Sequence, residues 1–448
     1  MNELKFMLPG LYALSSKGMK LDLERPRAGM ELLGNPQRDF PCVLITGTNG
    51  KGSTAAFLEA ILQEAGYKTG LFTSPHLVRY NERVRINGRE IEDAEIERLL
   101  KSVGEAIHFD FAVGKATDEK QYLPLTFFEV TTAMALLAFK EAKVDIAILE
   151  IGLGGRLDAT NVCDPIMTLI TTIGYDHTSI LGDTLEQIAA EKAATMRKSR
   201  PAIFGWIEGE ALATLKQKAN EIGADYFMTG DYFNIEDSGE SFTLSLEGER
   251  ISGLRPCLNG DYQLQNAAQA ALAALMLKRE NGFSKVTEAA VKRGLLKTRW
   301  RARAEWFEGD PPLIIDSSHN KEGIRSFIAH YERIARERGI KKAGLIFAST
   351  RAGFLSEVLE MLSPYFCDLV CTQSSSDRSV LAEDICAVAR RYFKNSSVAG
   401  GVKGAYELIR QRNPDLDLIV FTGSLYLAGN ALAMLEDPEA LENPFPNA

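Results

Sequence analysis

The sequence has no run of eighteen consecutive apolar residues, so it predicts no helix that crosses a membrane. Its first ten residues, MNELKFMLPG, lack the basic start and apolar stretch that are typical of a signal peptide. Basic residues are outnumbered by acidic ones, and the formal net charge of -9 argues against a nucleic-acid-binding surface. We therefore expect a cytoplasmic protein whose partners include neither membranes nor nucleic acids.

Cysteine is scarce, and its six positions are scattered along the chain, several of them inside apolar, strand-like runs. Cys367 and Cys371 are four residues apart, but no second pair of that kind accompanies them, as a zinc site would require. We expect buried free thiols in a reducing compartment rather than disulfides or a zinc site. The positions are Cys42, Cys163, Cys257, Cys367, Cys371 and Cys386.

The most informative stretch that is present is VLITGTNGKGST, residues 43–54. Apolar residues typical of a buried strand lead into three glycines, Lys51 lies between the last two, and two hydroxyl residues precede an amphipathic run. Such a turn lets the backbone approach a phosphate, while free N–H groups and the helix dipole attract the anion. The match to the P-loop pattern is imperfect, and an ordinary glycine turn is the less favoured interpretation. We expect a nucleotide site here.

The rest of the chain alternates strands and helices in the manner of parallel sheets. Its 448 residues are too many for one ordinary core, and a basic string at residues 297–303 interrupts the pattern. We expect an α/β protein with a P-loop-type ATPase domain over residues 1–297 and a Rossmann-like α/β domain over 298–448. A small antiparallel patch is expected over residues 226–256. Strands are predicted at 70–74, 144–152 and 167–174, and helices at 91–107, 127–142 and from about 261.

Polar residues follow several of the predicted strands, at the end of an open parallel sheet where ligands bind. They are Ser74 and His76, Glu150, and Asp176 with His177. Each alone is as consistent with a turn or capping role, but together with the loop at 47–53 they make four strand ends that converge on one place, which favours a site. Glu150 is the most informative, because a carboxylate in so apolar a strand is unfavourable unless it is paired or binds a cation such as magnesium.

Two further features have weaker interpretations. The glycine cluster after Glu150, IGLGGRLDATN, lacks the third glycine of a dinucleotide-binding turn, so a Rossmann cofactor is disfavoured. Lys192 stands in a helical pattern where a solvated charge is the ordinary expectation, and the residues alone assign it no role.

The sequence resembles the folylpolyglutamate synthases and their bifunctional form with dihydrofolate synthase activity, within the Mur ligase superfamily. The resemblance covers nearly the whole chain and is tightest over residues 43–193. It rests on motifs that stand in the family's order and at similar spacing. These are GTNGKGST (47–54), TSPHL (73–77), NERVRING (81–88), LTFFE (125–129), LEIGLGGRLDATN (149–161), Asp176-His177, IAAEKA (188–193), DSSHN (316–320) and GSLYL (423–427).

The resemblance implies an ATP-dependent ligase that phosphorylates a pteroate or folate carboxylate and joins it to the amine of glutamate. ATP would be held by Asn49, Gly50, Lys51, Gly52, Ser53, Asn266, Arg303 and Asp316. Magnesium, at two sites, would be held by Ser74, Glu150, His177 and Lys192, the last as a carbamate, and Lys51, Glu150, His177 and Lys192 would take part in catalysis. The pterin substrate would meet Leu21, Asp22, Leu23, Glu24, Arg25, Thr126, Phe127, Phe128, Glu129, Leu157, Asp158 and Ala159. The incoming glutamate would lie near His319 and Ser424.

The chemistry agrees with this implication. Phosphoryl transfer to a carboxylate joins two anions, so Lys51 and a divalent metal must neutralise charge. Because an acyl phosphate hydrolyses readily, we expect the active site in a cleft that the second domain closes. A Mur-type ligase acting on a cell-wall precursor and a non-catalytic ATP-binding switch remain alternatives, and we expect a monomer.

The chain departs from the family's usual pattern at three places. Residues 300–303 read Trp-Arg-Ala-Arg where Trp-Pro-Gly-Arg is usual, and residues 349–352 replace an Asp-Lys-Asp motif. The segment 259–263, NGDYQ, lacks a usual histidine.

Overall fold

The computed structural model describes residues 4–17, 22–228, 233–235, 241–246, 248–376 and 378–436. Leu21, one of the predicted substrate residues, lies outside these ranges. The chain forms two compact units. The first contains residues 1–76, 80–257 and 263–299, and the second contains 77–79, 258–262 and 300–448.

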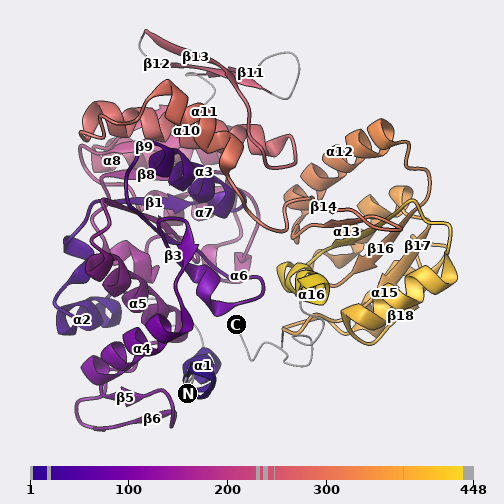
Figure 1. Ribbon diagram of the computed structural model, residues 1–448, viewed down its shortest axis with the longest axis horizontal. Helices are drawn as coiled ribbons and strands as arrows, with labels where there is room; N and C mark the ends of the chain where they lie inside the picture. The colour runs from indigo at the N-terminus through magenta and orange to yellow at the C-terminus, as the bar shows by residue number, and fades with distance from the viewer. Residues whose placement is uncertain are drawn as a thin grey trace. The chain divides into compact units, whose positions relative to one another are not determined.

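The first unit is built on an eight-stranded sheet in the order β10-β9-β8-β1-β7-β2-β3-β4 (Figure 1). The six strands from β10 to β2 are parallel, and β3 and β4 continue the sheet in antiparallel pairs. The strands are β1 Cys42–Thr46, β2 Thr69–Phe72, β3 Val84–Ile86, β4 Arg89–Glu90, β7 Ile146–Glu150, β8 Met167–Ile170, β9 Pro201–Phe204 and β10 Asp225–Met228.

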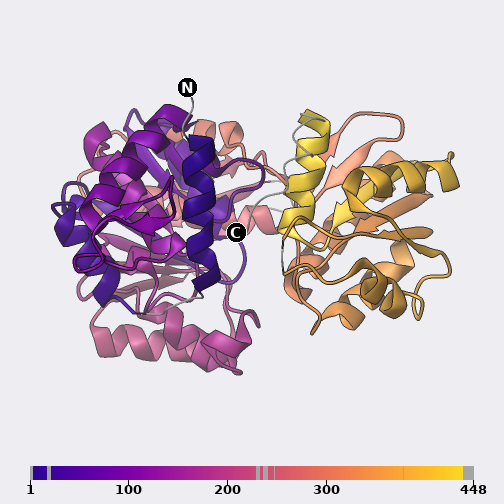
Figure 2. The ribbon, with the colours of Figure 1, turned by 90° about the horizontal axis from the view of Figure 1, so that it is seen from below.

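Helices cover both faces of this sheet, as expected where parallel strands are joined by helical crossovers. Figure 1 shows α3 and α10 on one side and α4 and α5 on the other, and Figure 2 shows α1 lying across α4 and α5. The helices are α1 Leu4–Ala13, α2 Glu24–Leu32, α3 Lys51–Glu64, α4 Asp93–Ile107, α5 Phe127–Ala142, α6 Thr178–Leu181, α7 Leu185–Ala193, α8 Gly209–Ile222, α10 Tyr262–Glu280 and α11 Glu288–Lys297. Short 3-10 turns are η1 Leu14–Lys17, η2 Pro36–Arg38, η3 Tyr80–Arg83 and η4 Ala159–Val162.

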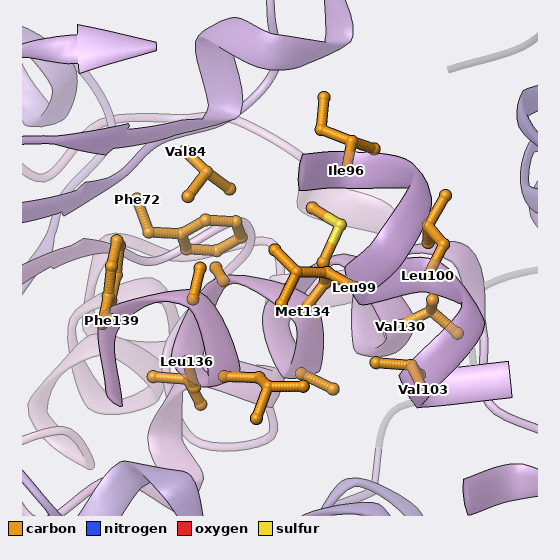
Figure 3. Packing of buried hydrophobic residues seen from close by; sticks show 14 of the residues in the cluster. Phe72, Val84, Ile96, Leu99, Leu100, Val103, Val130, Met134, Leu136 and Phe139 are labelled. Carbon is orange, nitrogen blue, oxygen red and sulfur yellow. The ribbon is translucent and has the colours of Figure 1, made fainter. Parts of the chain in front are cut away.

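The apolar residues of α4 and α5 interdigitate with the sheet in one continuous core. Figure 3 shows Leu99 and Met134 meeting between the two helices while Phe72 and Phe139 fill the space toward the strands. Full burial of such a side chain contributes roughly 1.5–3 kcal/mol, so this packing holds α5 firmly against β2 and β3.

Two small sheets complete the first unit. The hairpin β5 Phe109–Asp110 and β6 Lys115–Ala116 follows α4. The three-stranded antiparallel sheet contains β11 Phe233–Ile235, β12 Phe242–Leu246 and β13 Glu249–Leu254, and β13 contacts α11. The predicted antiparallel patch is thus present, but its first residues were misassigned. Residues 225–228 form β10, which pairs in parallel with β9 because the crossover helix α8 returns the chain in that direction.

The second unit has a six-stranded sheet in the order β14-β15-β19-β16-β17-β18, parallel except at β14. Its strands are β14 Glu305–Phe307, β15 Leu313–Ile315, β16 Ala343–Phe347, β17 Asp368–Cys371, β18 Ser396–Val398 and β19 Leu418–Thr422. Its helices are α12 Lys321–Arg338, α13 Leu355–Leu362, α14 Ala382–Ala389, α15 Gly401–Arg412 and α16 Leu425–Glu436, with the 3-10 turn η5 Ser363–Tyr365. β18 is a strand of three residues, two of them serine, so its sequence carries little apolar signal. The predicted fold class is confirmed.

Within the described ranges, we find no helix that combines the length and apolar character needed to cross a membrane.

Candidate functional site

The glycine-rich turn connects the carboxyl end of β1 to the first residue of α3, Lys51. Gly50 caps the helix with a φ of 87°, and Gly47 has a φ of 147°. A Cβ on Gly50 would lie 2.4 Å from Asn266 Oδ1, and one on Gly47 would lie 1.9 Å from Thr171 Oγ1. Only glycine suits both positions, because side chains are excluded by backbone conformation and by neighbours alike. The turn therefore has the bare backbone that the predicted phosphate contact needs.

Hydroxyl groups that follow β8 hold the turn in place. Thr171 Oγ1 donates to the carbonyl of Asn49 at 2.6 Å, and the N–H of Asn49 donates to Thr172 Oγ1 at 2.9 Å. Thr48 Oγ1 donates to the carbonyl of Gly174 at 3.2 Å. These threonines were not among the predicted site residues. The signal that could have found them is the pair of hydroxyl residues directly after an apolar strand.

Two lysines approach the same carbonyl oxygen of the turn. Lys51 Nζ lies 3.0 Å from Gly47 O, and Lys192 Nζ lies 3.1 Å from it. Lys192 is only 3% exposed, and burial, with the charge of Lys51 as the next cause, lowers its pKa to about 7. The ordinary expectation of a solvated lysine is therefore wrong, because α7 packs Lys192 against the glycine-rich turn.

Glu150 stands next to this turn through the register of the sheet. It is the last residue of β7 and pairs with Ile45 of β1, two residues before the turn begins at Gly47. The carboxylate is buried, and its Oε2 accepts a hydrogen bond from the N–H of Ser74 at 2.9 Å. The structure thus brings two of the predicted metal ligands, Ser74 and Glu150, into direct contact.

His177 has a different setting. It caps α6 in the left-handed conformation, with a φ of 50°, and its Nε2 lies 3.6 Å from an oxygen of buried Asp176. Across the described part of the chain, no three His, Cys, Asp or Glu side chains form a group that could hold a metal ion. Of the predicted ligands only Glu150 and His177 are of these residue types, so they would not form such a group by themselves. Its hydroxyl, carboxylate and imidazole, completed by a lysine carbamate, are a donor set rich in the hard oxygen atoms that magnesium prefers.

The amide side chains of α10 hydrogen-bond to the first turn of α3, directly after the glycine-rich turn. Asn266 is buried and donates to Gln263 Oε1 at 2.9 Å, while its Oδ1 accepts from Thr54 Oγ1 at 3.4 Å. Gln263, which is fully buried, donates to Ser53 Oγ at 3.3 Å. Asn266 was predicted to contact nucleotide and Gln263 was missed, although its polar side chain in an apolar helix was a usable signal.

The predicted substrate residues of α2 and α5 meet in one network. Arg25 pairs with Asp22 at 2.7 Å and with buried Glu129 at 3.0 Å. Glu129 also accepts from the N–H of Thr126 at 2.6 Å, closing a capping box at the start of α5. Leu23 stands at the N-cap of α2, and Glu24, its first residue, is exposed.

Aromatic rings surround the start of α5. Phe127 stacks on Tyr12 with ring centres 5.5 Å apart, and half-buried Phe128 lies 5.8 Å from Phe72.

Asp158, by contrast, is occupied within its own loop. Its carboxylate accepts from the N–H of Leu153 at 2.9 Å and from the hydroxyl of Thr160 at 2.6 Å, and burial raises its pKa. Leu157 beside it is half-buried and Ala159 is buried.

The remaining predicted residues belong to the second unit. Asp316 is buried and accepts from the N–H groups of Ala304 and Ser318 at 3.0 and 2.8 Å. Arg303 donates to Ser317 Oγ and to the carbonyl of Ala302.

His319 and Ser424 follow β15 and β19 at the carboxyl edge of the second sheet. His319 lines a small pocket with Ser349 and Arg351, two residues of the segment that departs from the family pattern. Ser424 is buried, and its Oγ accepts from the N–H of Tyr426 at 3.2 Å.

Known proteins share this architecture. A family model described as the Mur ligase middle domain matches residues 45–274, half of the chain. Dihydrofolate synthase/folylpolyglutamate synthase of Bacillus subtilis is 34% identical over 415 residues, covering 91% of this chain and 94% of the relative.

Two solved structures are also similar. Escherichia coli FolC in complex with DHPP and ADP has a TM-score of 0.83 and 29% identity, with 97% of this chain and 98% of that chain covered. The bifunctional folylpolyglutamate synthase/dihydrofolate synthase of Yersinia pestis, complexed with AMPPNP and Mn ion, has a TM-score of 0.82 and 29% identity over 96% and 98% of the two chains.

The phosphate turn, the parallel sheet and the matched middle domain together define a Mur ligase. More narrowly, the chain belongs to the family of folylpolyglutamate synthases and dihydrofolate synthases. The predicted family is confirmed, and the alternatives of a cell-wall ligase and of a non-catalytic switch gain no support from these relatives.

Proposed function

We propose that the chain is an ATP-dependent ligase that adds L-glutamate to dihydropteroate and to reduced folates through an acyl phosphate. The observation that carries the proposal is the convergence of Lys51 and Lys192 on Gly47, beside the buried carboxylate of Glu150. Such a site attracts a triphosphate and a divalent cation together. The related structures with ADP, AMPPNP and Mn ion support this interpretation.

The roles of the chain's own residues follow from their positions. The N–H groups of Gly50 to Ser53 would bind the phosphates, beside Asn49, whose own N–H donates to Thr172. Lys51 would neutralise charge as the substrate carboxylate attacks the terminal phosphorus. Asn266 would contact the nucleotide from α10. Contact of Arg303 and Asp316 with the nucleotide stays a prediction.

Ser74, Glu150, His177 and Lys192 would hold the magnesium ions. Bound there, magnesium would offset the negative charge that phosphoryl transfer gathers on the phosphate oxygens. The buried amine of Lys192 would join the set by attacking the carbon of CO2, forming an N–C bond and releasing a proton to solvent. Burial of Lys192 favours this step, because only the neutral amine carries the required lone pair.

The pterin would bind near the start of α5, where Phe127 and Phe128 offer apolar rings and Arg25, Asp22, Thr126 and Glu129 form a polar network. Asp158 would act by shaping its loop, with Leu157 and Ala159 beside it. His319 and Ser424 would receive glutamate. A monomer and a cytoplasmic location stay predictions, and light scattering on the purified protein tests the first.

The proposal is tested by incubating the protein with ATP, magnesium, glutamate and either dihydropteroate or a reduced folate. Mass spectrometry should show each acceptor heavier by one glutamyl residue, with one phosphate released for each bond formed. Addition to neither acceptor would contradict the proposal, and addition to only one would restrict the substrate class. Replacement of glutamate by other amino acids provides the control for the acceptor amine.

A further inference from the structure

The segment Thr73–His76 leaves the carboxyl end of β2 and carries Ser74, whose N–H donates to Glu150. His76 at the end of this segment and Arg83, directly before β3, have no part in the function proposed above. Their side chains are nevertheless buried, with exposed fractions of 4% and 3%. Burial of a guanidinium group is unfavourable unless its surroundings fix and compensate it, so this pair calls for a physical explanation.

Three hydrogen bonds fasten this segment to the start of β3. Arg83 Nε donates to His76 Nδ1 at 2.7 Å, and the carbonyl of Arg83 accepts from the N–H of Thr73 at 3.0 Å. Thr73 Oγ1 donates to the carbonyl of Glu82 at 3.4 Å. Because Arg83 can only donate, Nδ1 of His76 must be an acceptor in this arrangement. Nδ1 of His76 thus connects the segment Thr73–His76 to Arg83.

Aromatic rings in turn hold Arg83. Its guanidinium carbon lies 5.0 Å from the ring centre of Phe127 and 5.9 Å from that of Tyr80. These two rings meet edge to face, and the hydroxyl of Tyr80 donates to Thr131 Oγ1 at 3.0 Å. Both Phe127 and Thr131 belong to α5, which is packed in the core. The contacts with the two rings therefore fix the position of the Arg83 guanidinium relative to α5.

We propose that Arg83 and His76 are positioning residues, which hold Ser74 and Glu150 in the geometry that binds the metal–nucleotide complex. The inference rests on the proposed role of Ser74 and Glu150 as metal ligands. The geometry forms a continuous chain from α5 through Arg83 and His76 to the segment bearing Ser74. Residues behind a metal ligand characteristically change metal affinity by about 10- to 100-fold when they are replaced, without touching the metal themselves.

The test measures binding of Mn²⁺ with AMPPNP to the full-length protein by the relaxation of water protons. His76→Leu removes the acceptor at similar volume, and it should raise the Mn²⁺ concentration at half-saturation about tenfold or more. His76→Asn, whose Oδ1 lies near the position of Nδ1, should restore most of the affinity. Arg83→Lys keeps the charge but loses the fixed planar donor, and it should reproduce the defect of His76→Leu.

A control separates positioning from loss of stability. Leu100→Ala leaves a cavity in the same core, on α4, and should lower the melting temperature without moving the Mn²⁺ half-saturation point. If His76→Leu is not folded, Arg83→Lys and its comparison with His76→Asn carry the test.

Two outcomes distinguish the ways in which the ideas could fail. A folded His76→Leu or Arg83→Lys protein with wild-type Mn²⁺ affinity would overturn the positioning role. Glu150→Gln with wild-type Mn²⁺ affinity would instead overturn the metal site on which that role rests.

Discussion

Glu59 lets the pH dependence of stability be predicted in detail. It lies two turns into α3 and is 5% exposed, and burial raises the pKa of its carboxyl to about 7 from an ordinary 4.5. Its Oε1 accepts from Thr69 Oγ1 at 3.1 Å and from the N–H of Gly88 at 3.3 Å, and the charge of Arg85 also favours ionisation. These interactions compensate only part of the desolvation.

The sign follows from the bound protons. Between about pH 4.5 and pH 7 the folded state keeps a proton on Glu59 that the unfolded state has released, so stability falls as the pH rises through this window. With these two pKa values the loss between about pH 5 and about pH 8 is about 2.5 kcal/mol. Glu59→Gln keeps an oxygen for Thr69 and Gly88 but cannot ionise. The variant should therefore lack this loss and be the more stable protein at about pH 8.

Urea unfolding of both proteins across this pH range measures the difference. Trp206 belongs to the first unit, whereas Trp300 and Trp306 belong to the second. Substituting Phe for the latter two lets fluorescence report the unit that contains Glu59. Subtracting the two pH profiles cancels titrations that the proteins share. Profiles that stay parallel from about pH 5 to about pH 8 would refute the reasoning.

Three further predictions concern the site. Lys192→Met should lower the rate of ligation at saturating substrates by about 100-fold. Lys192→Arg should show the same low rate, because a guanidinium group forms no carbamate. Phosphate release measures the rate of both variants. Gly50→Ala should weaken AMPPNP binding and cost about 1–2 kcal/mol of stability, since the φ of 87° disfavours a side chain and its Cβ would meet Asn266. Calorimetry gives the affinity, and wild-type binding would contradict the assigned fit. Arg303→Ala should abolish ligation while magnesium–ATP binding stays measurable, and unaffected turnover would remove Arg303 from the nucleotide site.

Local patterns predicted much of the fold and the centre of the site. The turn at residues 47–52 is recognisable because a buried strand, its glycines and a helix start are adjacent in the chain. The helix predicted over about 127–142 agrees with α5, and the structure shows that a capping box of Thr126 and Glu129 begins it. Ser74, Glu150 and His177 were indicated by their places at the ends of predicted strands, whereas Lys192 as a metal ligand and the pterin and glutamate residues came from the resemblance to a family. Their roles stay proposals.

Features that depend on contacts distant in sequence could not be predicted in the same way. Thr171 and Thr172 hold Asn49 across more than one hundred residues, and that pairing exists only once β8 lies beside β1. The burial of Lys192 likewise arises when α7 packs on the turn, because its local helical pattern is that of a surface residue. Residues 225–228 joined the main sheet because of the path of α8 rather than their own composition.

The shared oxygen of Gly47 has a consequence for the protein without its nucleotide. Two amines crowded on a single acceptor repel each other as soon as both are protonated, and an arriving triphosphate relieves that repulsion. The empty protein should accordingly be the more heat-sensitive form. While Lys192 is not carbamylated, lowering the pH toward about 7 would increase the difference in melting temperature between the empty and the nucleotide-bound protein, because more of the Lys192 side chains take up a proton.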